Sequence, residues 1–212
     1  MYALITDGSI AKYLSGNRGI TIGGIQYPRN IFTLWTAAEK EAIGIYEVIQ
    51  NNAKKKDEAY YINTNQTFTY DADAGTVTAT FGDATARAHA DTTWTQDEID
   101  AGKAPAGADT DTVAVEGLKT IRIRTVKAQA AGILQDTDWY IVRKADASTA
   151  VPSAITTFRA AVRSKAAAME TLITNASNTP AIETLYTYVN TADEGDPVVM
   201  ERPLGEFPVL GS

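Results

Sequence analysis

Apolar residues recur at steps of three and four along two long stretches in the second half of the chain. This spacing is the period of an α-helix with one apolar face. Pro152 stands where the second stretch begins, a position where its missing N–H leaves no hydrogen bond unmade. We expect the two helices to close on each other as an antiparallel pair. Their apolar positions are Leu118, Ile121, Ile123, Val126, Ala130, Ile133 and Leu134 in the first stretch, and Ile155, Phe158, Val162, Met169, Leu172, Ile173 and Ala176 in the second.

The segment between the two stretches predicts a turn followed by a short strand. Residues 135–138 read Gln-Asp-Thr-Asp, short polar side chains that compete with the helical ladder and favour a turn. Residues 139–142, Trp-Tyr-Ile-Val, are aromatic or β-branched and favour a buried extended segment. Trp139 would then lock the corner of the helical pair, and its replacement by alanine would cost about 3–5 kcal/mol.

The first fifty residues predict small hairpins and a short helix. Segments 2–5 and 10–14 flank Asp7-Gly8, and segments 20–22 and 25–27 flank Gly23-Gly24, both typical hairpin signals. Thr36 and Glu39 have the spacing of a capping box, and Gly44 is typical of a helix end. Residues 45–49 are then extended.

The middle and the end of the chain are less regular. Alternating Thr and aromatic residues between 59 and 81 predict a β-ribbon, and residues 82–116 predict a loop with one capped helix after Trp94. Residues 181–188 predict a brief helix, and prolines at 197, 203 and 208 predict an extended arm. The fold class is therefore α+β. Its parts are an N-terminal β-rich domain (1–52), a β-ribbon insert with an acidic loop (53–116), a helical hairpin (117–190) and a C-terminal arm (191–212).

Composition narrows the function classes. The 212 residues carry a net charge of −7, which argues against a general binder of nucleic acid or of anionic membranes. No apolar run is long enough to span a bilayer, and no cysteine is present for disulfides or thiolate zinc sites. Acidic residues crowd the segment from Asp71 to Glu116, whereas basic residues are frequent in the two C-terminal helices. This asymmetry is explained by solubility. Alternatively, it supports head-to-tail contact between copies of the chain, or contact of an acidic patch with a basic partner.

Candidate catalytic groups are few. His89 is the only histidine and lies in an Ala-rich acidic segment without an obvious serine partner. Asp136 and Asp138 favour capping of the adjoining chain ends over paired-carboxylate chemistry. The pairs 71/73 and 109/111 have a D-x-D spacing but lack the further ligands of a calcium loop. We therefore predict no catalytic residue, no cofactor and no metal site.

Arg159 and Arg163 share one helix face and could grip a carboxylate of a partner, although a solvated face is the favoured explanation. Together with Trp139 they are the candidate partner-binding residues.

The residues from Leu134 to Ala145, followed by Pro152 and the run Phe158 to Arg163, resemble the C-terminal region of bacteriophage tail-fibre assembly proteins, also called tail assembly chaperones. In that pattern a helix ends in a leucine, then come Thr-Asp-Trp, a linker, a proline and an aromatic-Arg-x-x-x-Arg helix. The resemblance covers residues 117–185. The residues that carry it as a structural motif are Leu134, Thr137, Asp138, Trp139, Pro152 and Phe158.

A shorter resemblance to the front part of such proteins covers residues 19–46. It consists of the pattern Gly-x-x-Tyr-Pro-x-Asn, then Trp35, then Gly-Ile-Tyr at 44–46.

The resemblance implies a non-enzymatic phage tail protein. It would bind the host-recognition fibre or its attachment site, aid tail or tail-fibre assembly, and stay in the virion. Its partners would be tail or fibre proteins and other copies of itself, in the host cytoplasm during assembly and then in the virion tail.

Two alternatives stay open. The C-terminal arm is typical of a permanent structural, adaptor or fibre accessory subunit. Trp35, Trp94 and the pair Tyr60-Tyr61 would suit the sugar platform of a carbohydrate-binding or depolymerising tip.

Overall fold

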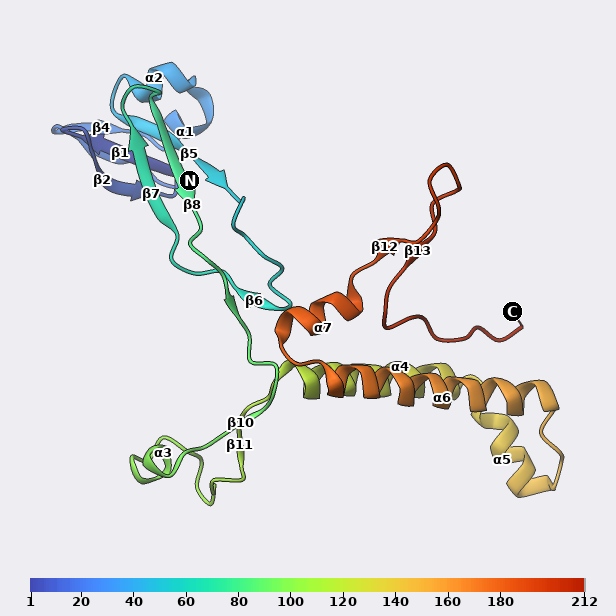
Figure 1. The fold of residues 1–212 in the computed structure, drawn as a ribbon. Coiled ribbons are helices and arrows are strands. Elements are labelled where there is room, and N and C mark those ends of the chain that lie inside the picture. The colour runs from blue at the N-terminus through green and yellow to red at the C-terminus, as the bar shows by residue number, and fades with distance from the viewer. Residues whose placement is uncertain (212) are drawn as a thin grey trace. The chain divides into compact units, whose positions relative to one another are not determined.

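A computed structural model describes residues 1–211 and confirms the mixed α+β class. The chain divides into two compact units, residues 1–85 and the remainder from Ala86 onward, and each is described by itself (Figure 1). The elements that begin in the first unit are β1 (Tyr2–Thr6), β2 (Ser9–Leu14), β3 (Ile20–Ile22), β4 (Ile25–Tyr27), α1 (Ile31–Leu34), α2 (Ala37–Glu41), β5 (Ile45–Asn51), β6 (Tyr61–Ile62), β7 (Thr67–Asp71), β8 (Thr76–Thr80) and β9 (Thr85–Ala86).

A curled five-stranded sheet organises the first unit, in the order β2-β1-β5-β8-β7. Only β5 and β8 run parallel, and the other neighbours are antiparallel. The inward positions of β1, β5 and β8 bury a core of Ala3, Val48, Val77 and Ala79. The two edge strands approach each other, because the rings of Tyr13 on β2 and Phe68 on β7 lie 4.6 Å apart between centroids.

The predicted hairpins and the first capping box are confirmed. β1 and β2 pair across the Asp7-Gly8 turn, and β3 and β4 pair across Gly23-Gly24. Thr36 accepts the N–H of Glu39 while the Glu39 carboxylate accepts the N–H of Thr36. The small helices α1 and α2 lie between β4 and β5, and a second apolar cluster there contains Leu14, Ile31, Phe32 and Ile45.

The predicted boundary between residues 52 and 53 is wrong. The ribbon β7–β8 is not a separate insert, because β8 pairs with β5 and so extends the N-terminal sheet. Alternating Thr and aromatic residues identified the strands but not their neighbours. The parallel pairing of β5 with β8 is set by burial of Val77 and Ala79 in the common core.

Two antiparallel helices organise the second unit. The salt bridge from Lys127 Nζ on α4 to Glu170 Oε2 on α6 measures 3.5 Å, and the predicted helical pair is confirmed. Its core consists of Val126, Ala130, Val162, Ala166, Met169, Ile173 and Leu204. The elements are β10 (Thr92–Thr93), α3 (Gln96–Asp100), β11 (Val113–Val115), α4 (Leu118–Gln135), α5 (Asp138–Ala147), α6 (Ser153–Asn175), α7 (Thr179–Tyr186), β12 (Val189–Asn190) and β13 (Met200–Glu201).

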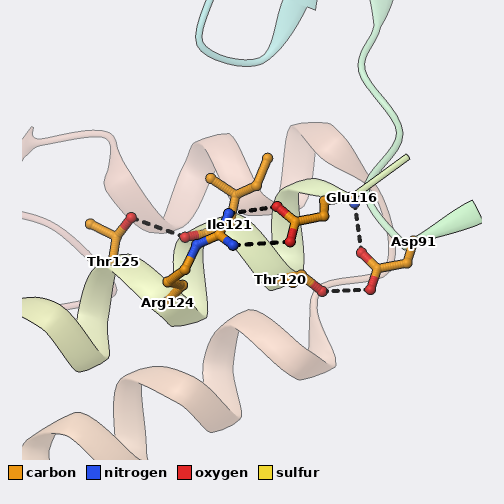
Figure 2. Close-up of polar contacts among 7 residues, drawn as sticks. Asp91, Glu116, Thr120, Ile121, Arg124 and Thr125 are labelled. Carbon is orange, nitrogen blue, oxygen red and sulfur yellow. Dashed lines mark hydrogen bonds and ion pairs between the residues drawn. The ribbon is translucent and has the colours of Figure 1, made fainter. Parts of the chain in front are cut away.

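The segment before α4 serves as the cap of that helix (Figure 2). The carboxylate of Asp91 accepts the N–H of Gly117 at 2.6 Å and the hydroxyl of Thr120 at 2.8 Å. The carbonyls of residues 88 and 89 accept the next two helical N–H groups, so the first three free donors at this helix start are satisfied. Residues 86–116 therefore belong to the helical unit and not to a ribbon insert.

An exposed ion pair spans the same helix start. Arg124 donates to both carboxylate oxygens of Glu116, at 2.9 and 2.5 Å (Figure 2). The hydrogen bonds from Arg124 lower the pKa of Glu116 below its ordinary value. Because both groups are exposed, the pair contributes little to stability.

Gly117 is the residue that permits this close approach. A Cβ at this position would lie 2.2 Å from the carbonyl carbon of Ala90, whereas a Cβ at Gly132, within α4, would meet nothing within 4 Å. Gly117→Ala should therefore destabilise the protein by about 1–3 kcal/mol. Gly132→Ala should stabilise it by about 0.5–1 kcal/mol, because glycine weakens a helix interior. Chemical denaturation measures both, and equal effects of the two substitutions would contradict this packing.

The C-terminal residues do not form the predicted extended arm. β12 and β13 pair as a short antiparallel ribbon. The chain then returns to the helices, where the Leu204 N–H donates to the Leu185 carbonyl at 3.0 Å. Leu204 is 2% exposed and Phe207 packs beside it. The prolines do stop regular structure, but Leu204 and Phe207 between them pack into the core of the helical pair.

Leu204→Ala should cost about 2–4 kcal/mol of unfolding free energy, because it leaves a cavity among Val162, Met169 and their neighbours. Val209→Ala is the matched control, since Val209 is 70% exposed and should change stability by less than about 0.5 kcal/mol. Urea unfolding curves test the pair. A loss below about 1 kcal/mol at Leu204 would show that the end of the chain lies free of the core.

Candidate functional site

The segment predicted as a buried strand is a helix. Residues 138–147 form α5, which buries none of its residues, and Trp139 is 52% exposed. Trp139 therefore does not lock the corner. A lone four-residue strand would need a sheet to pair its backbone groups, whereas a helix pairs them internally. Asp138 in the first turn and Lys144 in the last turn also suit the helix dipole.

One side of α5 carries an aromatic cluster in which Trp139 is exposed and Tyr140 is half-buried. The Trp139 and Tyr140 rings lie 4.6 Å apart between centroids, and the Arg143 guanidinium carbon lies 4.5 Å from the Trp139 ring centroid. Val142, one turn along, is 65% exposed. Cation–π stacking of this kind holds a large ring in one orientation without burying it. We call Trp139, Tyr140, Val142 and Arg143 the α5 face.

Arg159 on α6 connects the end of α4 to the start of α5. Its Nη1 donates to the Leu134 carbonyl at 2.8 Å, to Thr137 Oγ1 at 2.7 Å and to Asp138 Oδ1 at 2.8 Å. The side chain is only 12% exposed. Its Nη1 is thus engaged within the chain, and Arg159 is a structural clamp rather than the freely exposed partner-binding residue that the sequence predicts.

A basic hollow of about 420 Å³ lies between α5 and α6. Lys144 and Arg163 stand on its two sides, and Arg159 forms part of its wall. Within residues 1–211, the side chains of Lys144 and Arg163 make no hydrogen bond or ion pair. The remaining lining residues are Ile141, Ala150, Val151 and Thr156.

The structure brings together most of the residues singled out in the sequence. Thr137 is buried at the corner, and Leu134 and Phe158 pack against the helical core. Pro152 directly precedes α6, as predicted. Sequence reasoning missed Ile141 and Lys144. A helical period for residues 139–147 would have placed these two residues on the same side of the helix.

The other candidates have local structural roles. Asp71 accepts the N–H groups of residues 73 and 74, and Asp109 accepts the N–H of Asp111, so these carboxylates cap turns. Asp138 is paired with Arg159. Among residues 1–211, no group of three or more His, Cys, Asp or Glu side chains could hold a metal ion.

Comparisons add no relative to these observations. No protein-family model, no curated protein and no solved structure matches the chain. No helix within residues 1–211 is both long and apolar enough to cross a membrane. The α5 face and the basic hollow are therefore interpreted from their own geometry.

Arg159→Ala should lower the free energy of unfolding by about 2 kcal/mol, because it removes hydrogen bonds to a charged donor at a buried corner. Arg163→Ala, one turn further along the same helix, removes a side chain without a partner and should change stability by less than about 0.5 kcal/mol. Thermal and urea unfolding of the two variants measure the difference. Similar losses would mean that the clamp does not hold the corner.

Proposed function

We propose that the chain is a non-enzymatic bacteriophage tail protein that binds the host-recognition fibre or its attachment site and aids fibre assembly. The observation that carries the proposal is α5, a folded helix with none of its residues buried, in the same segment that resembles tail-fibre assembly proteins. Trp139 and Val142 are exposed on this helix, and the hydrogen bond from Arg159 to Asp138 fixes its start.

The chemistry of the α5 face suits protein binding. Tryptophan and arginine are the residues most enriched at the energetic centres of protein interfaces. A short helix that offers an aromatic and a branched apolar side chain fits a groove on a partner. Because Arg159 fixes the helix start, α5 loses little conformational entropy when it binds. The partner would be a tail or fibre protein with an apolar groove, met in the host cytoplasm during assembly.

The two alternatives have less support. The argument for a permanent structural subunit rested on an extended arm, and that segment folds onto its own helices through Leu204. The argument for a carbohydrate-binding tip rested on exposed aromatic residues. Tyr60 and Tyr61 are buried, and Trp35 packs edge-on against Tyr27.

The binding role is tested by Trp139→Ala combined with Val142→Ser in the full chain. Affinity for the purified fibre protein of the encoding phage should fall by at least about 30-fold, the loss typical of an interface hot spot. The free energy of unfolding should fall by less than about 1 kcal/mol, because both side chains are exposed. Titration calorimetry and urea unfolding measure the two effects.

Leu34→Ala combined with Ile25→Ser is the matched control, since it removes two exposed apolar side chains from the first unit. It should leave fibre binding unchanged. Unaltered binding in the Trp139 and Val142 variant would refute the assignment to the α5 face. Failure of the wild-type chain to bind any tail protein would refute the function.

A further inference from the structure

Opposite charges are segregated on two surfaces of the second unit. The first is the basic hollow, where Lys144 and Arg163 have no partner within residues 1–211. The second is the acidic loop, which we define as residues 96–111. Its only basic residue is Lys103, and its acidic residues are Asp97, Glu98, Asp100, Asp109 and Asp111.

The acidic loop has a defined structure, but its helix α3 contains no buried residue. Its ends are held by the β10–β11 pair and by the Trp94 N–H, which donates to the Thr112 carbonyl at 3.1 Å. A capping box of Thr95 and Glu98 starts α3, none of whose residues is buried. The side chains of Asp97 and Asp111 are exposed and have no hydrogen bond or ion pair among the described residues. The loop is thus a fixed projection that presents free carboxylates.

We propose that the acidic loop of one copy docks in the basic hollow of a second copy. Each surface holds two unpaired charges of one sign, and the chain supplies both halves of the contact. Within a single copy, no hydrogen bond or ion pair joins the two surfaces across the described residues. The hollow, of about 420 Å³, accommodates carboxylate side chains between Lys144 and Arg163 over the apolar Ile141 and Val151.

Such a contact is head-to-tail, because it joins different surfaces on the two copies. Each copy keeps one free loop and one free hollow, so association continues until a ring closes or a filament grows. The contact uses exposed charges, which makes it weak and sensitive to salt. It goes beyond the proposed function, since self-association requires neither the α5 face nor a fibre.

Sedimentation velocity on the full wild-type chain should show concentration-dependent oligomers at about 50 mM salt and a monomer at about 500 mM, where the screening length is shorter. The variant Lys144→Glu with Arg163→Glu carries an acidic hollow and an acidic loop. The variant Asp97→Lys with Asp111→Lys presents two lysines at the positions of the unpaired carboxylates, on a loop without net charge, and keeps the basic hollow. Each alone should be monomeric, with association weakened at least about tenfold, because like charges face each other.

An equimolar mixture of the two variants should associate again, because the loop of each meets a hollow of opposite charge on the other. This restoration also shows that both variants are folded. The matched control, Lys12→Glu with Arg18→Glu, changes the net charge as much as the hollow variant does, but in the first unit. It should associate as the wild type does.

A wild-type chain that stays monomeric at low salt would overturn the proposal, and so would a mixture that stays monomeric. Fibre binding is measured separately with the monomeric Lys144 and Arg163 variant, which leaves Trp139 and Val142 intact. A wild-type chain that binds the fibre but never self-associates would refute the docking of copies while leaving the proposed function standing.

Discussion

The hydrogen bonds of the Arg159 guanidinium determine how the second unit presents its surface. A single nitrogen donates to the Leu134 carbonyl in the last turn of α4, to the Thr137 hydroxyl oxygen and to the Asp138 carboxylate at the start of α5. The Leu134 carbonyl also accepts the N–H and the hydroxyl of Thr137, so the guanidinium adds a charged donor to a corner that is already hydrogen-bonded. Because α6 supplies the arginine, the orientation of α5 is tied to the packing of the helical pair. The α5 face and the basic hollow both depend on these hydrogen bonds between α6 and the start of α5.

The opposite end of the pair is closed in a different way. There Asp91 and the carbonyls of residues 88 and 89 accept the first three N–H groups at the start of α4, and Gly117 allows the two backbone segments to touch. The C-terminal segment closes one side through Leu204. Both chain segments that look irregular in the sequence thus complete the helical core. The exposed elements that remain, α5 and α3, are the ones to which binding roles are assigned.

Periodicity and capping chemistry were enough to predict the helical pair, the hairpins around Gly8 and Gly23-Gly24, and the capping boxes at Thr36 and Thr95. These features depend on neighbouring residues. The parallel pairing of β8 with β5 and the return of Leu204 to the core depend on distant residues, which local patterns do not contain. The predicted strand at residues 139–142 was wrong for a related reason. Its residues have a high β propensity, but no neighbouring strand within residues 1–211 pairs with them. The helical spacing singled out Arg159 as a candidate residue. Its hydrogen-bond partners could not be predicted, because they come together only in the folded corner.

The exchange of backbone amide hydrogens in residues 138–147 tests the preformed α5 helix most directly. In the free wild-type chain these amides should exchange more slowly than the amides of an unfolded chain, but faster than those of the core helices α4 and α6. In Arg159→Ala the protection of α5 should fall while most of α4 and α6 keeps theirs, because the clamp acts at the corner. Unprotected α5 amides in the wild type, or protection that is unchanged by the substitution, would contradict a helix held in place by Arg159.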